Sequence, residues 1–196
     1  MRSQVTTKRG DQGRTVTISG DEYSKSHPLL ECCGDLDALR AETALYRLEV
    51  LRSGRDDAQE LGAFLFWLLH VYFLLGSQCN DPGNKRPEYR KEDVGEKHLT
   101  RLESMQGRLE AEIRLPKAFI VSASNNLAAR FDLLCTTARC FERSVVRLKE
   151  EVPDFEAAAI LTFVNRLSDF LYVLARHLED GDHTPVDYSV LKDEEG

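Results

Sequence analysis

The residues best suited to chemistry lie near the start of the chain, in the stretch Thr6–Thr15. It reads Thr-Thr-Lys-Arg-Gly-Asp-Gln-Gly-Arg-Thr and so combines cations, hydroxyls and two glycines ahead of any helical pattern. Glycine lets the backbone approach a ligand closely, while lysine, arginine and threonine donate hydrogen bonds to phosphate oxygens. The stretch is not a Walker loop, because the pattern G-x-x-x-x-G-K-[ST] is absent. Its composition suits either a phosphate-binding loop or a solvated chain end.

Two further polar groups interrupt apolar stripes in the second half of the chain. Their members are Arg139, Glu142 and Arg143 on one predicted helix, and Asn165, Arg166, Ser168 and Asp169 on the next. If the two helices face each other at this depth, the groups form one site. Otherwise they are surface pairs, each worth about 0.2–0.5 kcal/mol.

Histidine and cysteine offer no clear catalytic or metal centre. His70 lies in an apolar segment, and we expect a core histidine rather than a ligand. Cys140 lies beside Arg139, but no histidine is close in sequence to activate it, so we expect a small buried side chain. Neither H-x-x-x-H nor Glu-x-x-His occurs, so we expect no metal held by protein side chains alone.

The composition is that of a folded, acidic domain. Of 196 residues, 42% are hydrophobic and 30% charged, and the formal net charge is -7, which argues against a nucleic-acid binder. The five cysteines form no C-x-x-C pair, so we expect free thiols in a reducing, cytoplasmic setting. Neither a signal peptide nor a membrane span is expected, because the most apolar run, Leu61–Gly76, is short and contains a histidine.

Apolar residues spaced by three and four predict five helices that form an all-α bundle. The expected helices run from about Leu30 to Ser53, Asp57 to Cys79, Leu99 to Ile113, Ser124 to Val152, and Asp154 to Glu179. We expect caps at Asp56 or Asp57, Ser124 and Asp154. The second helix is apolar nearly all round and should be the most buried. On the fifth, Ala159 should face inward.

The remaining segments should lack regular structure or be short and extended. Residues 1–28 are expected to form a polar loop in which Lys25 reaches the glycine-rich stretch. Residues 80–95 suit an insertion, a mobile lid or a passive crossover. Residues 117–122 should form a short extended bridge, and residues 180–196 a frayed acidic tail. With the bundle at 29–179, these segments make one domain.

The order of these pieces resembles the PduO-type ATP:cob(I)alamin adenosyltransferases. The resemblance covers about Thr6 to His177. The matching pieces are the Thr-Lys-Arg-Gly-Asp-Gln-Gly-Arg-Thr stretch, Lys25 before Pro28, Gly34-Asp35-Leu36-Asp37, Glu142-Arg143-Ser144-Val145-Val146 and Asn165-Arg166-Leu167-Ser168-Asp169-Phe170-Leu171. The resemblance implies a five-helix bundle that assembles as a trimer, with ATP and cobalamin bound between subunits.

The implied reaction moves the 5′-deoxyadenosyl group of ATP to cob(I)alamin and expels triphosphate, with Mg²⁺ as a helper. The resemblance makes residues 1–28 an ATP-binding segment and gives Lys8 and Arg139 catalytic roles. The implied ATP contacts are Thr7, Lys8, Arg9, Gly10, Thr15, Val16, Lys25, Arg139, Cys140, Phe141, Glu142, Arg143 and Asn165. Phe119 would lie against the lower face of the corrin and keep the lower axial ligand from cobalt. Asp37 would lie at the subunit interface.

The chain departs from the family pattern near this site. Ser122-Ala123-Ser124 replaces the usual Pro-Gly-Gly after the phenylalanine segment. Cys135 and Cys140 replace two arginines, of which the first pairs in the family with the aspartate matching Asp37. Ala38 replaces a glutamate. A catalytic protein would need another cation, such as Arg130 or Arg166, in this neighbourhood. A non-catalytic nucleotide- or corrinoid-binding carrier, sensor or assembly partner is the alternative hypothesis.

Overall fold

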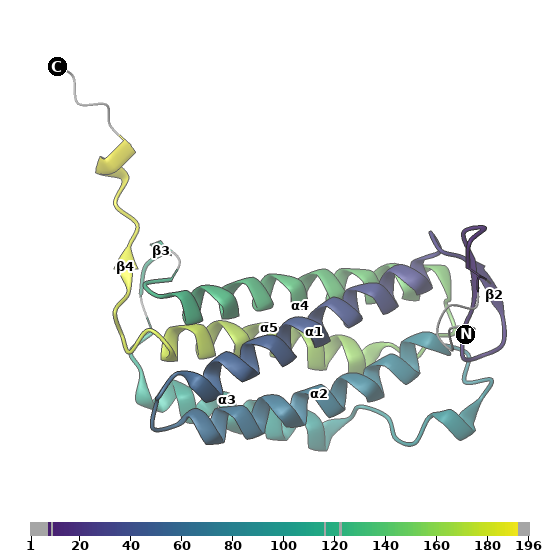
Figure 1. Cartoon of the computed structure of the whole chain (residues 1–196), viewed down its shortest axis with the longest axis horizontal. Coiled ribbons are helices and arrows are strands. Elements are labelled where there is room, and N and C mark those ends of the chain that lie inside the picture. The colour runs from purple at the N-terminus through teal and green to yellow at the C-terminus, as the bar shows by residue number, and fades with distance from the viewer. Residues whose placement is uncertain (1–7, 9, 116, 122, 192–196) are drawn as a thin grey trace, which may run out of the picture.

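The computed structural model describes residues 8, 10–115, 117–121 and 123–191, and five long helices dominate it (Figure 1). The helices are α1 (Pro28–Arg52), α2 (Ala58–Asn80), α3 (Glu96–Glu112), α4 (Asn126–Glu151) and α5 (Ala158–His177). The short elements are β1 (Arg14–Val16), β2 (Glu22–Ser24), β3 (Ile120–Val121), β4 (Thr184–Pro185) and the 3-10 helices η1 (Pro87–Tyr89) and η2 (Tyr188–Leu191). The predicted all-α bundle is confirmed.

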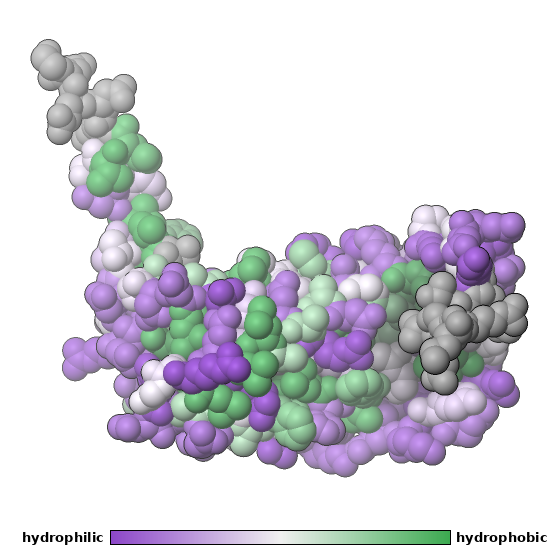
Figure 2. Space-filling model, in the orientation of Figure 1, coloured by the Kyte–Doolittle hydropathy of each residue, from purple (hydrophilic) through white to green (hydrophobic). Residues whose placement is uncertain are grey.

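The most buried helix is α5, and the prediction that α2 holds this position was wrong. α5 packs against both α3 and α4, while α1 packs against α2 and α4. Phe66 and Phe73 of α2 are 50% and 62% exposed, so its apolar residues cover an outer face as well as the core. Figure 2 shows apolar side chains among charged ones over α1 and α2.

Two helices, α2 and α5, are long and apolar enough to cross a membrane by length and composition alone. Both pack within the bundle, and buried helices of globular domains meet the same criterion. This property is therefore weak support for a membrane span.

The predicted apolar stripes are largely the observed core. On α1, Leu36, Leu39, Tyr46 and Val50 are all buried. On α4, buried residues recur at every turn from Phe131 to Leu148. The expected inward position of Ala159 was wrong, because the core position at the start of α5 belongs to Ile160.

The predicted helix caps were wrong in detail. Asn125, rather than Ser124, caps α4 by accepting a hydrogen bond from the Ala128 amide at 2.9 Å. The N-cap residue of α5 is Ala157, which lies three residues after Asp154. Asp57 occupies the N-cap position of α2 but makes no capping hydrogen bond. Its carboxylate is engaged by tertiary partners, which a local sequence pattern does not contain.

The N-terminal segment contains an unpredicted β-hairpin. β1 and β2 pair antiparallel, with Thr15 opposite Tyr23. The hairpin is held by the loop of residues 81–95 and by the end of α2: Lys85 Nζ of the loop lies 2.5 Å from Asp21 Oδ2, and the Ile18 amide donates to Asn80 Oδ1 of α2 at 2.8 Å. The hairpin stands at one end of the bundle (Figure 1).

The C-terminal tail is partly ordered, contrary to the frayed tail predicted for residues 180–196. β4 pairs antiparallel with β3, with Ile120 opposite Pro185, and the Val186 amide donates to the Phe119 carbonyl at 2.9 Å. Residues 192–196 lie outside the described part. This small sheet lies at the bundle end opposite the hairpin (Figure 1).

Candidate active site

The two polar groups predicted on separate helices meet on one face of the bundle. Asn165 Nδ2 donates to Glu142 Oε1 at 3.3 Å, which joins α5 to α4. Arg139 lies one turn before Glu142 and is exposed. Among the described residues, none forms an ion pair with Arg139. Its guanidinium is therefore available to an anionic ligand on this face.

Arg166 orients the amide of Asn165. Its Nη1 donates to Asn165 Oδ1 at 3.0 Å and lies 3.7 Å from Asp169 Oδ2. Its Nε lies 3.3 Å from Glu103 Oε1 on α3. Ser168 is buried and donates to the Asn165 carbonyl at 3.0 Å, so its role is structural. In the polar group of α5, Asn165 thus presents an exposed amide, and Arg166 and Ser168 hold it in place.

Two side chains on α4 lie differently from the sequence interpretation. Cys140 is exposed, so the predicted small buried side chain was wrong; Arg143 Nη2 donates to its Sγ at 2.9 Å. Phe141 is fully buried in the core. Its ring therefore packs in the core rather than on the exposed polar row.

Cys135, at the position where the resemblance implies an arginine, is a buried thiol. Cys135 donates to the Ser168 carbonyl at 3.2 Å. Burial raises the pKa of the Cys135 thiol, and the positive charge of Arg139 opposes this. Asp37 pairs instead with Arg40 on its own helix, at 2.9 Å. Its side chain is 68% exposed and remains accessible to a second subunit.

Two cations, Arg130 and Arg166, were expected to substitute for the arginines that the resemblance implies. Arg166 lies next to Asn165, whereas Arg130 is engaged elsewhere. Arg130 Nε lies 2.5 Å from Glu49 Oε2, and its guanidinium stacks over Tyr46 with 5.4 Å to the ring centroid. Only Arg166 therefore belongs to the polar face described above.

The glycine-rich stretch and Lys25 come together as predicted. The Lys25 amide donates to the Gly13 carbonyl at 2.8 Å. A Cβ built on Gly10 would lie 2.9 Å from Lys25 Nζ, so the ammonium rests directly over Gly10. This approach requires the absence of a side chain at Gly10.

Other residues of this segment are accessible to solvent. Lys8 is exposed and has a φ of 60°, and Val16 is 59% exposed. Thr15 is half-buried in β1. Thr7 and Arg9 lie outside the described residues. Among the described residues, no hydrogen bond or ion pair joins the segment 8–25 to the polar face of α4 and α5.

Phe119 is presented to solvent at the far end of the bundle, with 85% of its surface exposed. It borders a cavity of about 520 Å³. The other lining residues are Lys117, Ala118, Tyr172, Val186 and Tyr188. An exposed aromatic ring beside an aromatic cavity suits a flat apolar ligand.

His70 is exposed, so the predicted core histidine was wrong. Its Nδ1 lies 2.8 Å from the Phe66 carbonyl, and the two rings meet edge to face. Within the described ranges, no group of three or more His, Cys, Asp or Glu side chains is placed to hold a metal ion.

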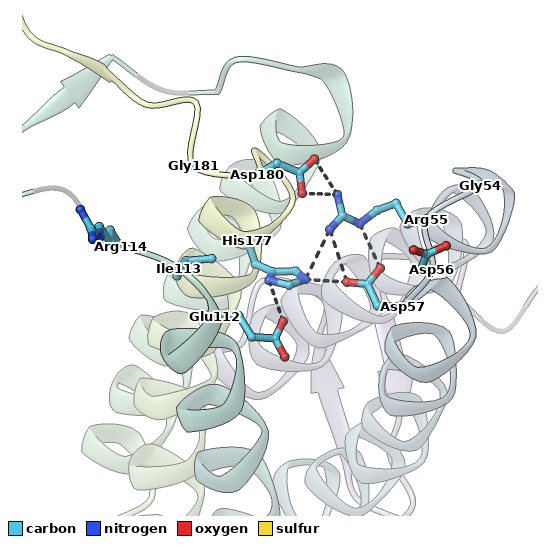
Figure 3. Close-up of a pocket in the computed structure, with 10 residues that line it drawn as sticks. All are labelled: Gly54, Arg55, Asp56, Asp57, Glu112, Ile113, Arg114, His177, Asp180 and Gly181. Carbon is cyan, nitrogen blue, oxygen red and sulfur yellow. Dashed lines mark hydrogen bonds and ion pairs between the residues drawn. The ribbon is translucent and has the colours of Figure 1, made fainter.

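A polar cavity of about 760 Å³ at the end of α5 was not predicted (Figure 3). His177 Nε2 lies 2.5 Å from Asp57 Oδ2, and Arg55 pairs with Asp57 at 3.0 Å and Asp180 at 2.9 Å. These contacts tie the start of α2 to the end of α5. The sequence pattern gave no signal, since His177 lies 120 positions from Asp57 and Asp180 lies 125 positions from Arg55.

Comparison with known proteins identifies relatives along nearly the whole chain. The Salmonella typhimurium corrinoid adenosyltransferase PduO is 31% identical over 179 residues, which are 91% of this chain and 50% of that protein. The human corrinoid adenosyltransferase MMAB is 26% identical over 174 residues, or 89% of this chain and 68% of that protein. The chain thus spans about half the length of its PduO relatives.

Solved structures share the fold. A variant of the PduO-type ATP:corrinoid adenosyltransferase from Lactobacillus reuteri, complexed with cobalamin and ATP, superposes with a TM-score of 0.80 at 22% identity. The match covers 92% of this chain and 94% of that one. The cobalamin adenosyltransferase family model matches residues 5–178, which include the glycine-rich stretch and both polar groups. The chain belongs to the cobalamin adenosyltransferase family.

Proposed function

We propose that this protein transfers the 5′-deoxyadenosyl group of ATP to cob(I)alamin. The Co(I) electron pair forms the bond to C5′, while the C5′–O bond breaks and triphosphate leaves with its electron pair. The observation that carries this proposal is the joined polar face of α4 and α5. There Glu142 and Asn165 are hydrogen-bonded, and Arg139 is exposed with no ion-pair partner among the described residues.

ATP would be held by the N-terminal segment and this polar face together. Lys8, Lys25 and Arg139 would neutralise charge that develops on the leaving triphosphate. The Gly10 backbone permits a close approach, and Asn165 would contact the nucleoside. Thr7, Arg9, Thr15, Val16, Cys140, Glu142 and Arg143 complete the proposed nucleotide contacts.

Mg²⁺ would arrive with the triphosphate. This ion usually keeps several waters and binds phosphate oxygens together with one or two carboxylates. Glu142 offers one carboxylate on the polar face, which fits that mode of binding. The ion would offset the negative charge that the leaving group acquires.

Phe119 would contact the lower face of the corrin. Its 85% exposure supports a role in binding rather than in the core. An apolar ring at this position excludes the lower axial ligand, which makes Co(II) easier to reduce.

The site would be completed by a second subunit of a cytoplasmic homotrimer. This proposal is supported by the lack of contacts, among described residues, between the segment 8–25 and the polar face. Exposed Phe66 and Phe73 on α2 offer apolar surface for such an assembly. Asp37 would lie at the interface.

Arginine-to-alanine variants test the assignment of the polar face. Arg139→Ala should lower kcat/KM about hundredfold, since loss of one donor to a developing charge typically has an effect of this size. Lys8→Ala should abolish turnover. Arg108→Ala is the matched control, because Arg108 is exposed and pairs with Glu60 away from the site. Equal losses in the Arg139 and Arg108 variants would refute the assignment.

A further inference from the structure

One buried carboxylate connects the segment that carries Phe119, residues 117–121 and here called the Phe119 segment, to the C-terminal tail. Glu179, two residues after α5, has a side chain that is only 1% exposed. Its Oε1 accepts a hydrogen bond from the Ser124 amide at 2.9 Å, and its Oε2 lies 2.7 Å from His183 Nδ1. Arg176 Nε lies 3.1 Å from the same Oε2. Burial of a carboxylate is costly without such partners, so this geometry is strongly favoured.

The partners of Glu179 come from three separate segments. Ser124 follows the Phe119 segment, and His183 directly precedes β4. Arg176 belongs to α5 and is fixed to α4 through Asp132, at 2.7 Å. Glu179 therefore anchors both strands of the β3–β4 pair to the rigid end of the bundle.

The Phe119 segment needs such an anchor because its own contacts are few. The residue Phe119 is 85% exposed, so packing does little to fix the position of its ring. Its backbone is held by the Val186 amide, which donates to the Phe119 carbonyl at 2.9 Å. The position of the Phe119 ring therefore depends on how firmly the β3–β4 pair is held.

The chain between β3 and α4 also contains a strained residue. Ala123 has a φ of 54°, in the left-handed region that disfavours residues with a Cβ. The next amide, that of Ser124, donates to Glu179. This hydrogen bond holds the strained turn in the conformation that leads from Phe119 into α4.

We propose that Glu179 is a positioning residue for Phe119, and so for the lower face of the corrinoid site. Through Ser124 and His183 it fixes the β3–β4 pair, which sets where the Phe119 ring lies. This inference rests on the proposed function. Glu179 is not among the ligand contacts predicted from the sequence. In this proposal, exclusion of the lower axial ligand by Phe119 depends on it.

Glu179→Gln tests the proposal in the whole 196-residue chain. Glutamine keeps an oxygen for the Ser124 amide but removes the charge that faces Arg176 and His183. Asp180→Asn is the matched control, because the neighbouring Asp180 is exposed, its carboxylate pairs with Arg55, and among the described residues it makes no hydrogen bond to β3 or β4. Thermal unfolding and circular dichroism establish that both variants fold.

The first readout is the paramagnetic resonance spectrum of cob(II)alamin with ATP, which reports whether the lower axial nitrogen is bound. Glu179→Gln should reduce the fraction without that ligand about five- to tenfold, as expected for loss of charge-assisted bonds. It should lower kcat and leave the KM for ATP unchanged, and Asp180→Asn should match the unmodified protein. A normal spectrum for Glu179→Gln would overturn the proposal.

Amide hydrogen exchange gives a readout that needs neither ATP nor corrinoid. Exchange of the Val186 amide should accelerate at least tenfold in Glu179→Gln and in the milder His183→Ala, but not in Asp180→Asn, because the β3–β4 pair opens locally. If the Val186 amide exchanges at the unmodified rate in both Glu179→Gln and His183→Ala, then Glu179 does not anchor the β3–β4 pair. An unmodified protein that never releases the lower ligand would refute the proposed function instead, and the exchange result would still decide the anchor.

Discussion

Replacement of Gly10 by alanine should weaken ATP binding by displacing the Lys25 ammonium. The added Cβ would lie 2.9 Å from Lys25 Nζ and 3.2 Å from Cε, both closer than side chains normally approach. The next nearest atom, the Arg14 carbonyl oxygen, is 3.7 Å away, which is an ordinary contact. The conflict is thus confined to the end of one flexible side chain, which moves to relieve it.

The size of the effect follows from what Lys25 contributes. A hydrogen bond to a charged group is worth about 1.5–3 kcal/mol, and the exposure of Lys25 places it near the lower limit. Lys25→Ala should therefore raise the KM for ATP about tenfold, since about 1.4 kcal/mol corresponds to a factor of ten. Gly10→Ala only displaces the ammonium, so we expect about a two- to fivefold increase.

The assay is a double-mutant cycle on the KM for ATP, measured anaerobically at saturating cob(I)alamin. In the Lys25→Ala background, Gly10→Ala should have no further effect, because the atom it displaces is gone. Gly13→Ala is the control: Gly13 has a φ of 76° and nothing within 4 Å of its added Cβ, so its effect is backbone strain that persists in either background. Additive effects of Gly10→Ala and Lys25→Ala would refute this account of the loop.

Three further predictions concern stability. Phe170→Ala should cost about 3–5 kcal/mol in urea unfolding, because Phe170 is fully buried on the central helix. Ala123→Gly should raise the melting temperature by a few degrees, because relief of about 1–2 kcal/mol of left-handed strain exceeds the added unfolded-state entropy of about 0.4–1 kcal/mol. Burial raises the pKa of the Asp57 carboxyl, but hydrogen bonds from Arg55 and His177 outweigh it and hold that pKa below 3.8. The resulting stability is present above about pH 4 and lost as the pH falls through the lower folded value, and thermal unfolding of Asp57→Asn should lack this dependence.

Periodicity predicted the bundle well because burial repeats with the helix turn. The α1 stripe through Leu36, Leu39 and Tyr46 is buried as its spacing indicates. The same reasoning ranked α2 above α5 in burial, because the number of apolar residues does not reveal which helix has neighbours on two sides. Phe66 and Phe73 contribute to the hydropathy of α2 although both are substantially exposed.

Local signals failed where tertiary partners compete for the same side chain. Asp57 has the residue type of a cap, yet its carboxylate binds His177, 120 positions away. The β3–β4 pair joins segments separated by more than sixty positions, and both strands are only two residues long. Glu179 stands at the predicted end of the fifth helix, next to the acidic tail, and its burial becomes apparent only once three segments are placed around it.

The most direct test of the proposed function is one anaerobic reaction. Purified protein is mixed with ATP, Mg²⁺ and chemically reduced cobalamin, and the visible spectrum and triphosphate release are followed together. We predict that adenosylcobalamin accumulates with one triphosphate released for each cobalt–carbon bond formed. ATP binding without adenosylcobalamin would contradict catalysis and favour a carrier or sensor. The physical reason would then be Cys135 and Cys140, which stand where the resemblance implies two arginines.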